Sequence, residues 1–142
     1  MIIQIRGTSG SGKTWAMKRV MELLGPRSAV YVAGRKQPLY YQFPEDAHIP
    51  TTWAVYVLGH YEIACGGCDT LGSARETFDV WAKLRSEVSL PHTLMEGLLL
   101  SEDSKWTLEM NKVDEVRVIY LTTPVEQCLE RIRSRRARLS QE

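Results

Sequence analysis

The stretch GTSGSGKT at residues 7–14 constrains the fold of this 142-residue chain more than any other part of the sequence. It fits the pattern G-x-x-x-x-G-K-[ST], whose fixed positions are occupied by Gly7, Gly12, Lys13 and Thr14. The apolar run MIIQIR (1–6) precedes it and is typical of a buried strand, and an amphipathic segment at 13–25 follows it. This pattern forms a phosphate-binding loop where a strand meets the start of a helix. The sequence therefore predicts a strand–loop–helix unit at residues 1–25.

The loop is expected to hold the phosphates of a nucleotide. Its glycines let backbone N–H groups curl around phosphate oxygens, and the helix N-terminus adds a partial positive charge. Lys13 would reach the β- and γ-phosphates, and the Thr14 hydroxyl would bind Mg²⁺. The expected phosphate-binding residues are Gly7, Thr8, Ser9, Gly10, Ser11, Gly12, Lys13 and Thr14. The predicted cofactors are therefore ATP and Mg²⁺.

The remainder of the chain alternates between strand-like and helix-like segments. Further strands are expected at residues 28–34, 51–61 and 115–121, and within the apolar run 92–100. Further helices are expected after Ser73, at 101–112 and at about 124–138, whereas residues 34–50 look like a loop with three prolines. This alternation predicts an α/β fold: a three-layer sandwich whose mostly parallel sheet is covered on both faces, in a single domain at 1–142.

Charge and composition exclude several classes of protein. The formal net charge is +1, so the molecule as a whole attracts nucleic acid weakly. The N-terminus has no basic region followed by a cleavage site, and no run approaches the roughly 18 apolar residues that span a bilayer. The three cysteines are too few for a disulfide scaffold. The sequence predicts a soluble cytoplasmic protein without a membrane partner, located in the host cytoplasm if the protein is viral.

Glu96 is the single charged residue within the apolar run HTLMEGLLL at 92–100. A buried carboxylate is costly unless a cation or a hydrogen-bond donor compensates it. We therefore expect Glu96 to help Thr14 hold the metal, directly or through water. The alternative is an acid at the exposed end of a strand.

The C-terminal helix is rich in arginine. From Leu129 onward, five arginines against two glutamates give a net charge of +3. Arg131, Arg135 and Arg138 should share one face, beside an apolar stripe formed by Val125, Cys128, Leu129 and Ile132. Such a face can be solvated surface, but over a polyphosphate its guanidinium groups would stabilise transition-state charge.

The sequence resembles the small P-loop kinases related to phage polynucleotide kinase. The resemblance rests on GTSGSGKT, the acid in the glycine-rich stretch EIACGGCDTLGS, the acid-bearing strand, and TTPVEQCLERIRSRR. It implies a lid helix with an R-x-x-x-R pair, which Arg131 and Arg135 match. More narrowly, GHYEIACGGCDT, MEGLLLS and TTPVEQCLERIRSRR are similar to small phage proteins identified as 5-hydroxymethyluracil DNA kinases. That similarity implies transfer of the γ-phosphate of ATP to the hydroxymethyl group of this base in phage DNA.

Asp69 is the candidate general base. The resemblance implies a carboxylate just beyond a strand that accepts the proton of the attacking hydroxyl, and Gly66 and Gly67 beside it would allow a substrate to approach. The alternative for Asp69 is the N-cap of a helix near residue 70. Cys65 and Cys68 supply two metal ligands where structural zinc takes four. A redox role lacks its usual setting, so both cysteines are expected to be incidental.

Other residues allow two interpretations each. Arg35 and Lys36 follow one expected strand, and His60 and Tyr61 follow the next, at strand ends where α/β proteins bind ligands. Each could contact an acceptor or be plain surface. An aromatic cluster in the expected loop could stack an extruded base or pack at the edge of the core; it consists of Tyr40, Tyr41 and Phe43.

Three functions remain open from the residues alone. The first is a kinase acting on DNA, a free nucleoside, a polynucleotide end or another small molecule. The second is a nucleotide-binding regulator without catalysis, and the third is an ATPase. The two candidate acids and the arginine pair favour the kinase, with a nucleoside triphosphate as donor and DNA as acceptor.

Overall fold

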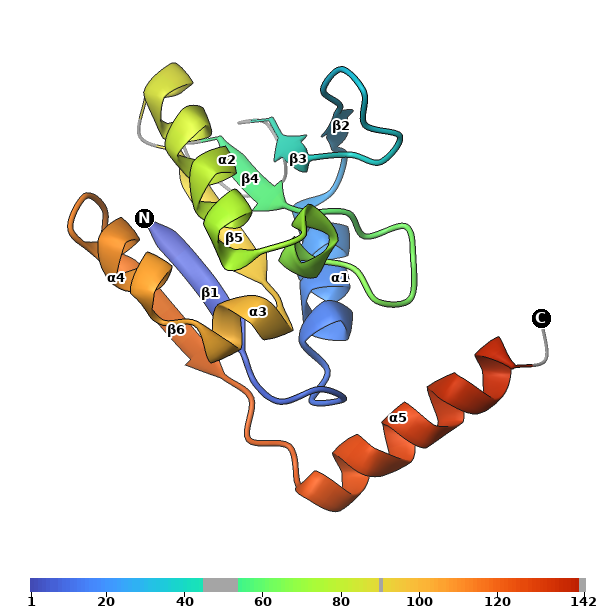
Figure 1. Ribbon diagram of the computed structural model, residues 1–142. Coiled ribbons are helices and arrows are strands. Elements are labelled where there is room, and N and C mark those ends of the chain that lie inside the picture. Colours follow the sequence, from blue (N-terminus) through green and yellow to red (C-terminus); the bar gives the residue numbers. More distant parts are fainter. Residues whose placement is uncertain (45–53, 90, 141–142) are drawn as a thin grey trace.

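The computed structural model describes residues 1–44, 54–89 and 91–140 (Figure 1). Its strands are β1 (Ile2–Arg6), β2 (Ser28–Val30), β3 (Tyr40–Phe43), β4 (Val55–Leu58), β5 (His92–Glu96) and β6 (Val116–Tyr120). Its α-helices are α1 (Lys13–Leu24), α2 (Ala74–Glu87), α3 (Leu98–Glu102), α4 (Lys105–Asn111) and α5 (Val125–Leu139). A short 3₁₀ helix, η1, spans Cys68–Leu71. Within the described residues, no helix is long and apolar enough to cross a membrane.

The strands form one six-stranded sheet in the order β2-β3-β4-β5-β1-β6. The strands β4, β5, β1 and β6 run parallel to one another, while β3 is antiparallel to both β2 and β4. Because β1 lies between β5 and β6, the loop that follows it opens at the carboxyl end of the parallel strands, next to the end of β5. This is the edge at which α/β sheets bind ligands.

Two apolar layers cover the sheet, as expected. On one face, α1 packs through Met17, Met21 and Leu24 against Tyr41 and Val57 of the sheet. On the other face, α2, α3 and α4 contribute Trp81, Leu84, Leu100 and Met110. The fold is therefore a mixed α/β arrangement with helices on both faces (Figure 1).

The helix after Ser73 begins as expected. The Ser73 hydroxyl accepts a hydrogen bond from the backbone N–H of Glu76 at 3.0 Å, which caps α2. The expected strand at 28–34 is shorter in the structure, where β2 has three residues. The expected strand at 51–61 reduces to β4, and residues 51–53 lie outside the described residues.

The expectation of a loop throughout 34–50 is wrong. Residues 40–43 form β3, which pairs with strands on both of its sides. Tyr41 and Phe43 are each 1% exposed and belong to the core on the α1 face. Their burial excludes them from stacking an extruded base. Tyr40 packs against Tyr56, with ring centroids 5.9 Å apart.

Candidate active site

The glycine-rich loop joins β1 to α1, and its shape depends on backbone conformations that favour glycine. Gly12 has φ 102° and directly precedes the first turn of α1. Gly10 has φ 80°, and a Cβ there would lie 2.5 Å from the carbonyl oxygen of Cys128. Glycine at position 10 thus lets the start of α5 approach the loop backbone.

Lys13 is folded against the loop. Its Nζ donates to the carbonyl oxygens of Gly7 at 2.7 Å and Thr8 at 3.0 Å, and the residue is 8% exposed. Burial lowers the pKa of Lys13, while the nearby carboxylates of Glu96 and Asp69 act in the opposite direction. A partly desolvated ammonium group therefore faces two acids from within the loop.

Glu96 ends β5 and is 1% exposed, which excludes an acid at an exposed strand end. The Thr14 hydroxyl donates to its Oε1 at 3.0 Å. Burial raises the pKa of Glu96 to about 7, against the opposing effects of the Thr14 hydrogen bond and the Lys13 charge. A Cβ at Gly67 would collide with the Glu96 side chain, so the glycine lets this segment close over the carboxylate.

A carboxylate and a hydroxyl oxygen held together in this way suit a hard cation. Mg²⁺ prefers oxygen ligands and keeps several waters, so it needs only one or two protein groups. The Thr14–Glu96 pair supplies such a donor set. Among the described residues, no group of three or more His, Cys, Asp or Glu side chains could form a denser metal site.

Asp69 lies in η1 and caps a helix that is distant in sequence. Its Oδ2 accepts from the backbone N–H of Leu98 at 2.8 Å, and its Oδ1 accepts from that of Leu99 at 3.0 Å. Asp69 thus satisfies two N–H groups at the start of α3, a different helix from the one near residue 70 that the sequence suggested. A Cβ at Gly97 would lie 2.7 Å from Oδ1, so a side chain there would disturb this contact.

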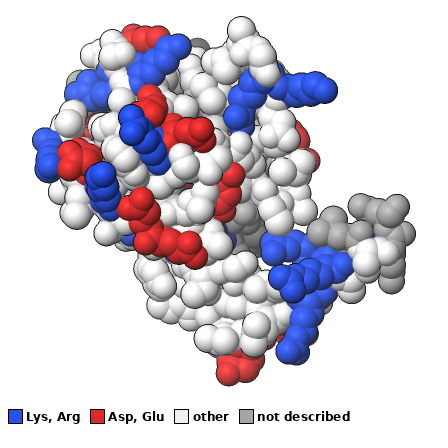
Figure 2. Space-filling view, in the orientation of Figure 1, with Lys and Arg blue, Asp and Glu red and all other residues white. Residues whose placement is uncertain are grey.

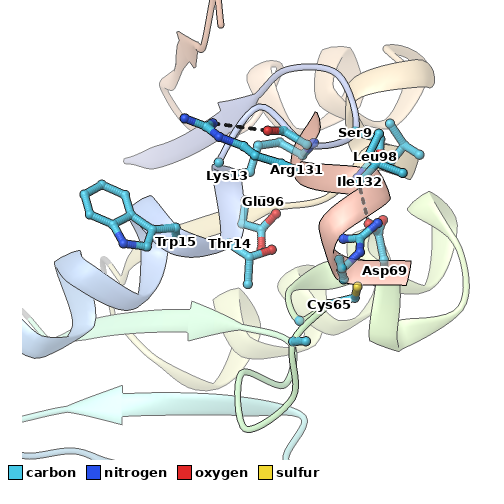
Figure 3. A pocket seen from close by; sticks show the side chains of 15 residues that line it. Ser9, Lys13, Thr14, Trp15, Cys65, Asp69, Glu96, Leu98, Arg131 and Ile132 are labelled. Atoms are coloured by element: carbon cyan, nitrogen blue, oxygen red, sulfur yellow. Dashed lines mark hydrogen bonds between the residues drawn. The ribbon is translucent and has the colours of Figure 1, made fainter. Parts of the chain in front are cut away.

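The candidate groups meet in one cavity of about 340 Å³ at the carboxyl ends of the strands. Its walls include Lys13, Thr14, Asp69 and Glu96, together with Arg131 and Arg135 from α5 (Figure 3). Trp15, Cys65 and Ile132 also line it. Figure 3 shows Glu96 between Trp15 on one side and Asp69 on the other.

The first half of α5 is attached to the loop. Arg131 Nη1 donates to the carbonyl oxygens of Gly10 at 3.2 Å and Ser11 at 3.4 Å. The Thr123 hydroxyl donates to the same Ser11 oxygen at 2.8 Å. Cys128, which is 4% exposed, lies with its sulfur 3.6 Å from the Thr8 hydroxyl. These contacts hold the N-terminal half of α5 over the loop.

The arginines of α5 border two different spaces. Arg131 and Arg135 line the cavity, whereas Arg138 shares a surface hollow on α5 with Arg131, Gln127, Glu130 and Ser134. The expected apolar stripe is also largely open to solvent, because Val125 is 63% and Leu129 is 45% exposed. The helix crosses the end of the sheet rather than covering a face, so a full apolar stripe has nothing to pack against (Figure 1).

The cysteines are free thiols in different surroundings. Cys65 is exposed at the cavity wall, whereas Cys68 is buried in η1. Burial raises the pKa of the Cys68 thiol well above its ordinary value, which keeps it protonated and unreactive. Neither cysteine is part of a zinc site formed by described residues.

The residues at the other strand ends have structural contacts. His60 is 6% exposed and forms an isolated bridge with Gly67, while Tyr61 is 3% exposed in the core. Arg35 donates from Nη2 to the carbonyl oxygen of Thr70 at 2.8 Å, which ties the β2–β3 connection to η1. Lys36 is exposed.

Sequence reasoning did not single out Trp15 as a site residue. The signal was present, because Trp15 is a large apolar side chain outside the helical face formed by Met17, Met21 and Leu24. Its place next to Thr14 in the sequence put this side chain beside the glycine-rich loop.

Fold and site together define an α/β protein with a glycine-rich loop and a mixed cluster of acids and bases at the carboxyl ends of its parallel strands. Comparison with known proteins gives the family. The chain is 38% identical over 136 residues to the 5-hmdU DNA kinase of Pseudomonas phage PaMx11, a match that covers 95% of the chain and 69% of that protein. The chain belongs to the 5-hmdU DNA kinase family, which confirms the resemblance seen in the sequence. No protein-family model matches the chain, and no solved structure matches it.

Proposed function

We infer that the protein is an ATP-dependent P-loop kinase that phosphorylates the hydroxymethyl group of 5-hydroxymethyluracil in DNA. The observation that carries this proposal is the meeting of Lys13, the Thr14–Glu96 pair and Asp69 in one cavity. The family relationship to a phage 5-hmdU DNA kinase supports the choice of acceptor.

The glycine-rich loop would bind the phosphates of the donor. Lys13 already points its ammonium group at the loop carbonyls of Gly7 and Thr8. A bound triphosphate would offer this group charged oxygens in place of neutral carbonyls, and charge-assisted hydrogen bonds are stronger. The ammonium group would then stabilise the negative charge that spreads over the transferring phosphoryl group.

Thr14 and Glu96 would hold Mg²⁺. The hydroxyl and carboxylate oxygens lie 3.0 Å apart, close enough for one cation or one of its waters to contact both. Mg²⁺ bound there would neutralise charge on the donor phosphates. Binding would also keep Glu96 ionised, since a cation favours the carboxylate over the protonated form.

Asp69 would orient and deprotonate the acceptor hydroxyl. Its two hydrogen bonds from Leu98 and Leu99 fix the direction of the carboxylate. Each carboxylate oxygen keeps a further lone pair for a hydroxyl proton. Glu96 is the alternative base, with a pKa of about 7, but its contact with Thr14 favours the metal role.

Arg131 and Arg135 would contact the phosphates from α5. Both residues line the cavity. Figure 2 shows basic side chains gathered over this helix, which carries Arg131, Arg133, Arg135, Arg136 and Arg138. A DNA strand entering the cavity beside α5 would meet this positive surface. The expected DNA binding is weak and sensitive to salt, because few phosphates would be contacted.

The test is transfer of radiolabelled γ-phosphate from ATP. The acceptors are matched oligonucleotides that contain thymine or 5-hydroxymethyluracil, and free 5-hydroxymethyl-2′-deoxyuridine. We expect label on the oligonucleotide with the modified base and none on its thymine counterpart. Label only on the free nucleoside, or at a 5′ end regardless of base, would identify a small-molecule or polynucleotide-end kinase instead. ATP hydrolysis unaffected by any acceptor would identify an ATPase, and ATP binding without turnover a regulator.

A further inference from the structure

A second hollow lies beside the glycine-rich loop, apart from the acids. It has a volume of about 550 Å³ and is formed by the loop, the first turn of α1, and the segment that joins β6 to α5. Gly12, Trp15 and Arg131 line both this hollow and the cavity with Lys13 and Glu96. The two spaces therefore adjoin one another at these three residues. Trp15 lies on the opposite side of Glu96 from Asp69, so the second hollow is away from the proposed acceptor (Figure 3).

Trp15 contributes a large aromatic side chain to the wall of this hollow. Trp15 is 74% exposed, although tryptophan side chains are mostly buried on average. It extends from the first turn of α1, whose buried face carries Lys13, Met17 and Met21. An exposed aromatic side chain in the wall of a hollow offers a flat apolar face on which a ligand can pack.

The other walls have the composition of a site for a planar polar ring. Leu121 supplies apolar surface. Arg131 supplies a guanidinium plane, which its hydrogen bonds to Gly10 and Ser11 hold in place. Ser11 is 4% exposed, and its hydroxyl has no hydrogen-bond partner among the described residues. Nucleobases combine a flat π-face with polar edges, and they bind to aromatic rings, arginine planes and hydroxyl groups.

We propose that this hollow binds the nucleobase of the phosphate donor, with the base stacked on Trp15 and bordered by Arg131. The ribose and phosphates then pass Gly12 into the glycine-rich loop, which places the γ-phosphate between Lys13 and the acids. Arg131 contacts both ends of the donor through this arrangement, while Arg135 serves the phosphates alone. The inference rests on the proposed function, since it assigns the base site of the same nucleotide.

Calorimetric titration with two ligands separates the base from the phosphates. The ligands are a non-hydrolysable ATP analogue with an imido bridge and inorganic tripolyphosphate. Trp15→Ala should weaken binding of the analogue by about ten-fold, because base–aromatic stacking is lost. Its affinity for tripolyphosphate should stay at the wild-type value. Trp15→Phe keeps an aromatic face and should retain most of the affinity.

Leu23→Ala is the matched control. Leu23 is 65% exposed on the same helix and lines neither hollow, so its removal should change neither affinity. In the transfer assay, Trp15→Ala should raise the KM for ATP by about the same factor of ten while kcat changes by less than about two-fold. Circular dichroism should give the variants the wild-type melting temperature within about 2 °C.

The outcomes distinguish the two proposals. Unchanged affinity of Trp15→Ala for the analogue would overturn the base site and leave the kinase proposal standing. An equal loss for the analogue and for tripolyphosphate would also overturn it, since the tryptophan would then act on the phosphates. Failure of the wild-type protein to bind the analogue at all would overturn the proposed function itself.

Discussion

The two sides of the candidate site are built in different ways. Lys13, at the start of α1, and Glu96, at the end of β5, are 8% and 1% exposed. On the facing side, Cys128 is the one buried residue of α5 among those whose side chains are described, while Val125 and Leu129 are open to solvent. The sheet side is held by the core, and α5 by a few hydrogen bonds to the glycine-rich loop.

This difference in burial indicates which side chains of the site are held rigidly by the fold. Elements with many buried apolar contacts open only at a high free-energy cost, whereas elements with few such contacts open more easily. Lys13 and Glu96 therefore have fixed positions before any ligand binds. The α5 arginines can adjust to the phosphates, because their helix is attached at its N-terminal half alone.

Among the residues on the sheet side of the site, substitution of Lys13 should have the largest effect on phosphoryl transfer. Lys13→Ala should lower kcat for phosphoryl transfer by at least about 100-fold, since a charge aimed at the transition state is lost. The melting temperature should change little, because the ammonium group contacts loop carbonyls rather than the core. Arg19→Ala, which removes an exposed charge from the same helix, is the control and should keep full activity. An active Lys13→Ala variant would contradict the kinase proposal.

Asp69→Asn should have the second largest effect on phosphoryl transfer. We expect kcat to fall by about 100-fold or more with little change in ATP affinity, because the acceptor proton loses its base. The amide nitrogen would also face one of the two N–H groups of α3, which should lower the free energy of unfolding by about 1–2 kcal/mol. Urea titration and steady-state kinetics measure the two effects. A loss of stability with full activity would make Asp69 a helix cap and nothing more.

The third prediction concerns the stability of the buried acid. The pKa of Glu96 is raised to about 7 from 4.5, so the folded state binds the proton more tightly than the unfolded chain. This contribution to stability is complete below pH 4.5 and is lost as the pH rises through about 7. Its size is up to about 3 kcal/mol.

A comparison of wild type with Glu96→Gln isolates this effect. In metal-free buffer, the free energy of unfolding of wild type should fall relative to that of the variant between pH 5 and pH 8. Addition of Mg²⁺ at pH 8 should restore part of the difference, since a cation stabilises the ionised carboxylate. Parallel pH profiles for the two proteins would show that Glu96 titrates normally in the folded state.

Arg135→Ala should have the smallest effect and tests α5 directly. Because Arg135 lines the cavity from a loosely held helix, we expect kcat to fall by about ten-fold and the melting temperature to stay within about 2 °C. Arg138→Ala, on the same helix but outside the cavity, is the matched control and should leave kcat with a short oligonucleotide acceptor that contains 5-hydroxymethyluracil unchanged. Equal effects of the two substitutions would show that α5 contributes only general positive charge.

Several features on the sheet side of the site could be predicted from local sequence patterns. The loop at 7–14, the cap at Ser73 and the burial of Glu96 depend on residues that are close in sequence or on the polarity of one strand. The aromatic segment at 40–43 was misjudged because its strand is defined by pairing with β2 and β4. Prolines on either side suggested a loop, and only the neighbouring strands supply the partners for its backbone groups.

The sequence by itself determined the α/β class, the glycine-rich loop, and the presence of a carboxylate inside an apolar strand. These features depend on the order of polar, apolar and glycine residues within short segments of the chain. Only the tertiary structure decided that Asp69 caps α3, that Arg138 does not line the cavity with Arg131 and Arg135, and that Trp15 borders both hollows. Each of these depends on contacts between segments brought together by the sheet order β2-β3-β4-β5-β1-β6, which no local pattern specifies.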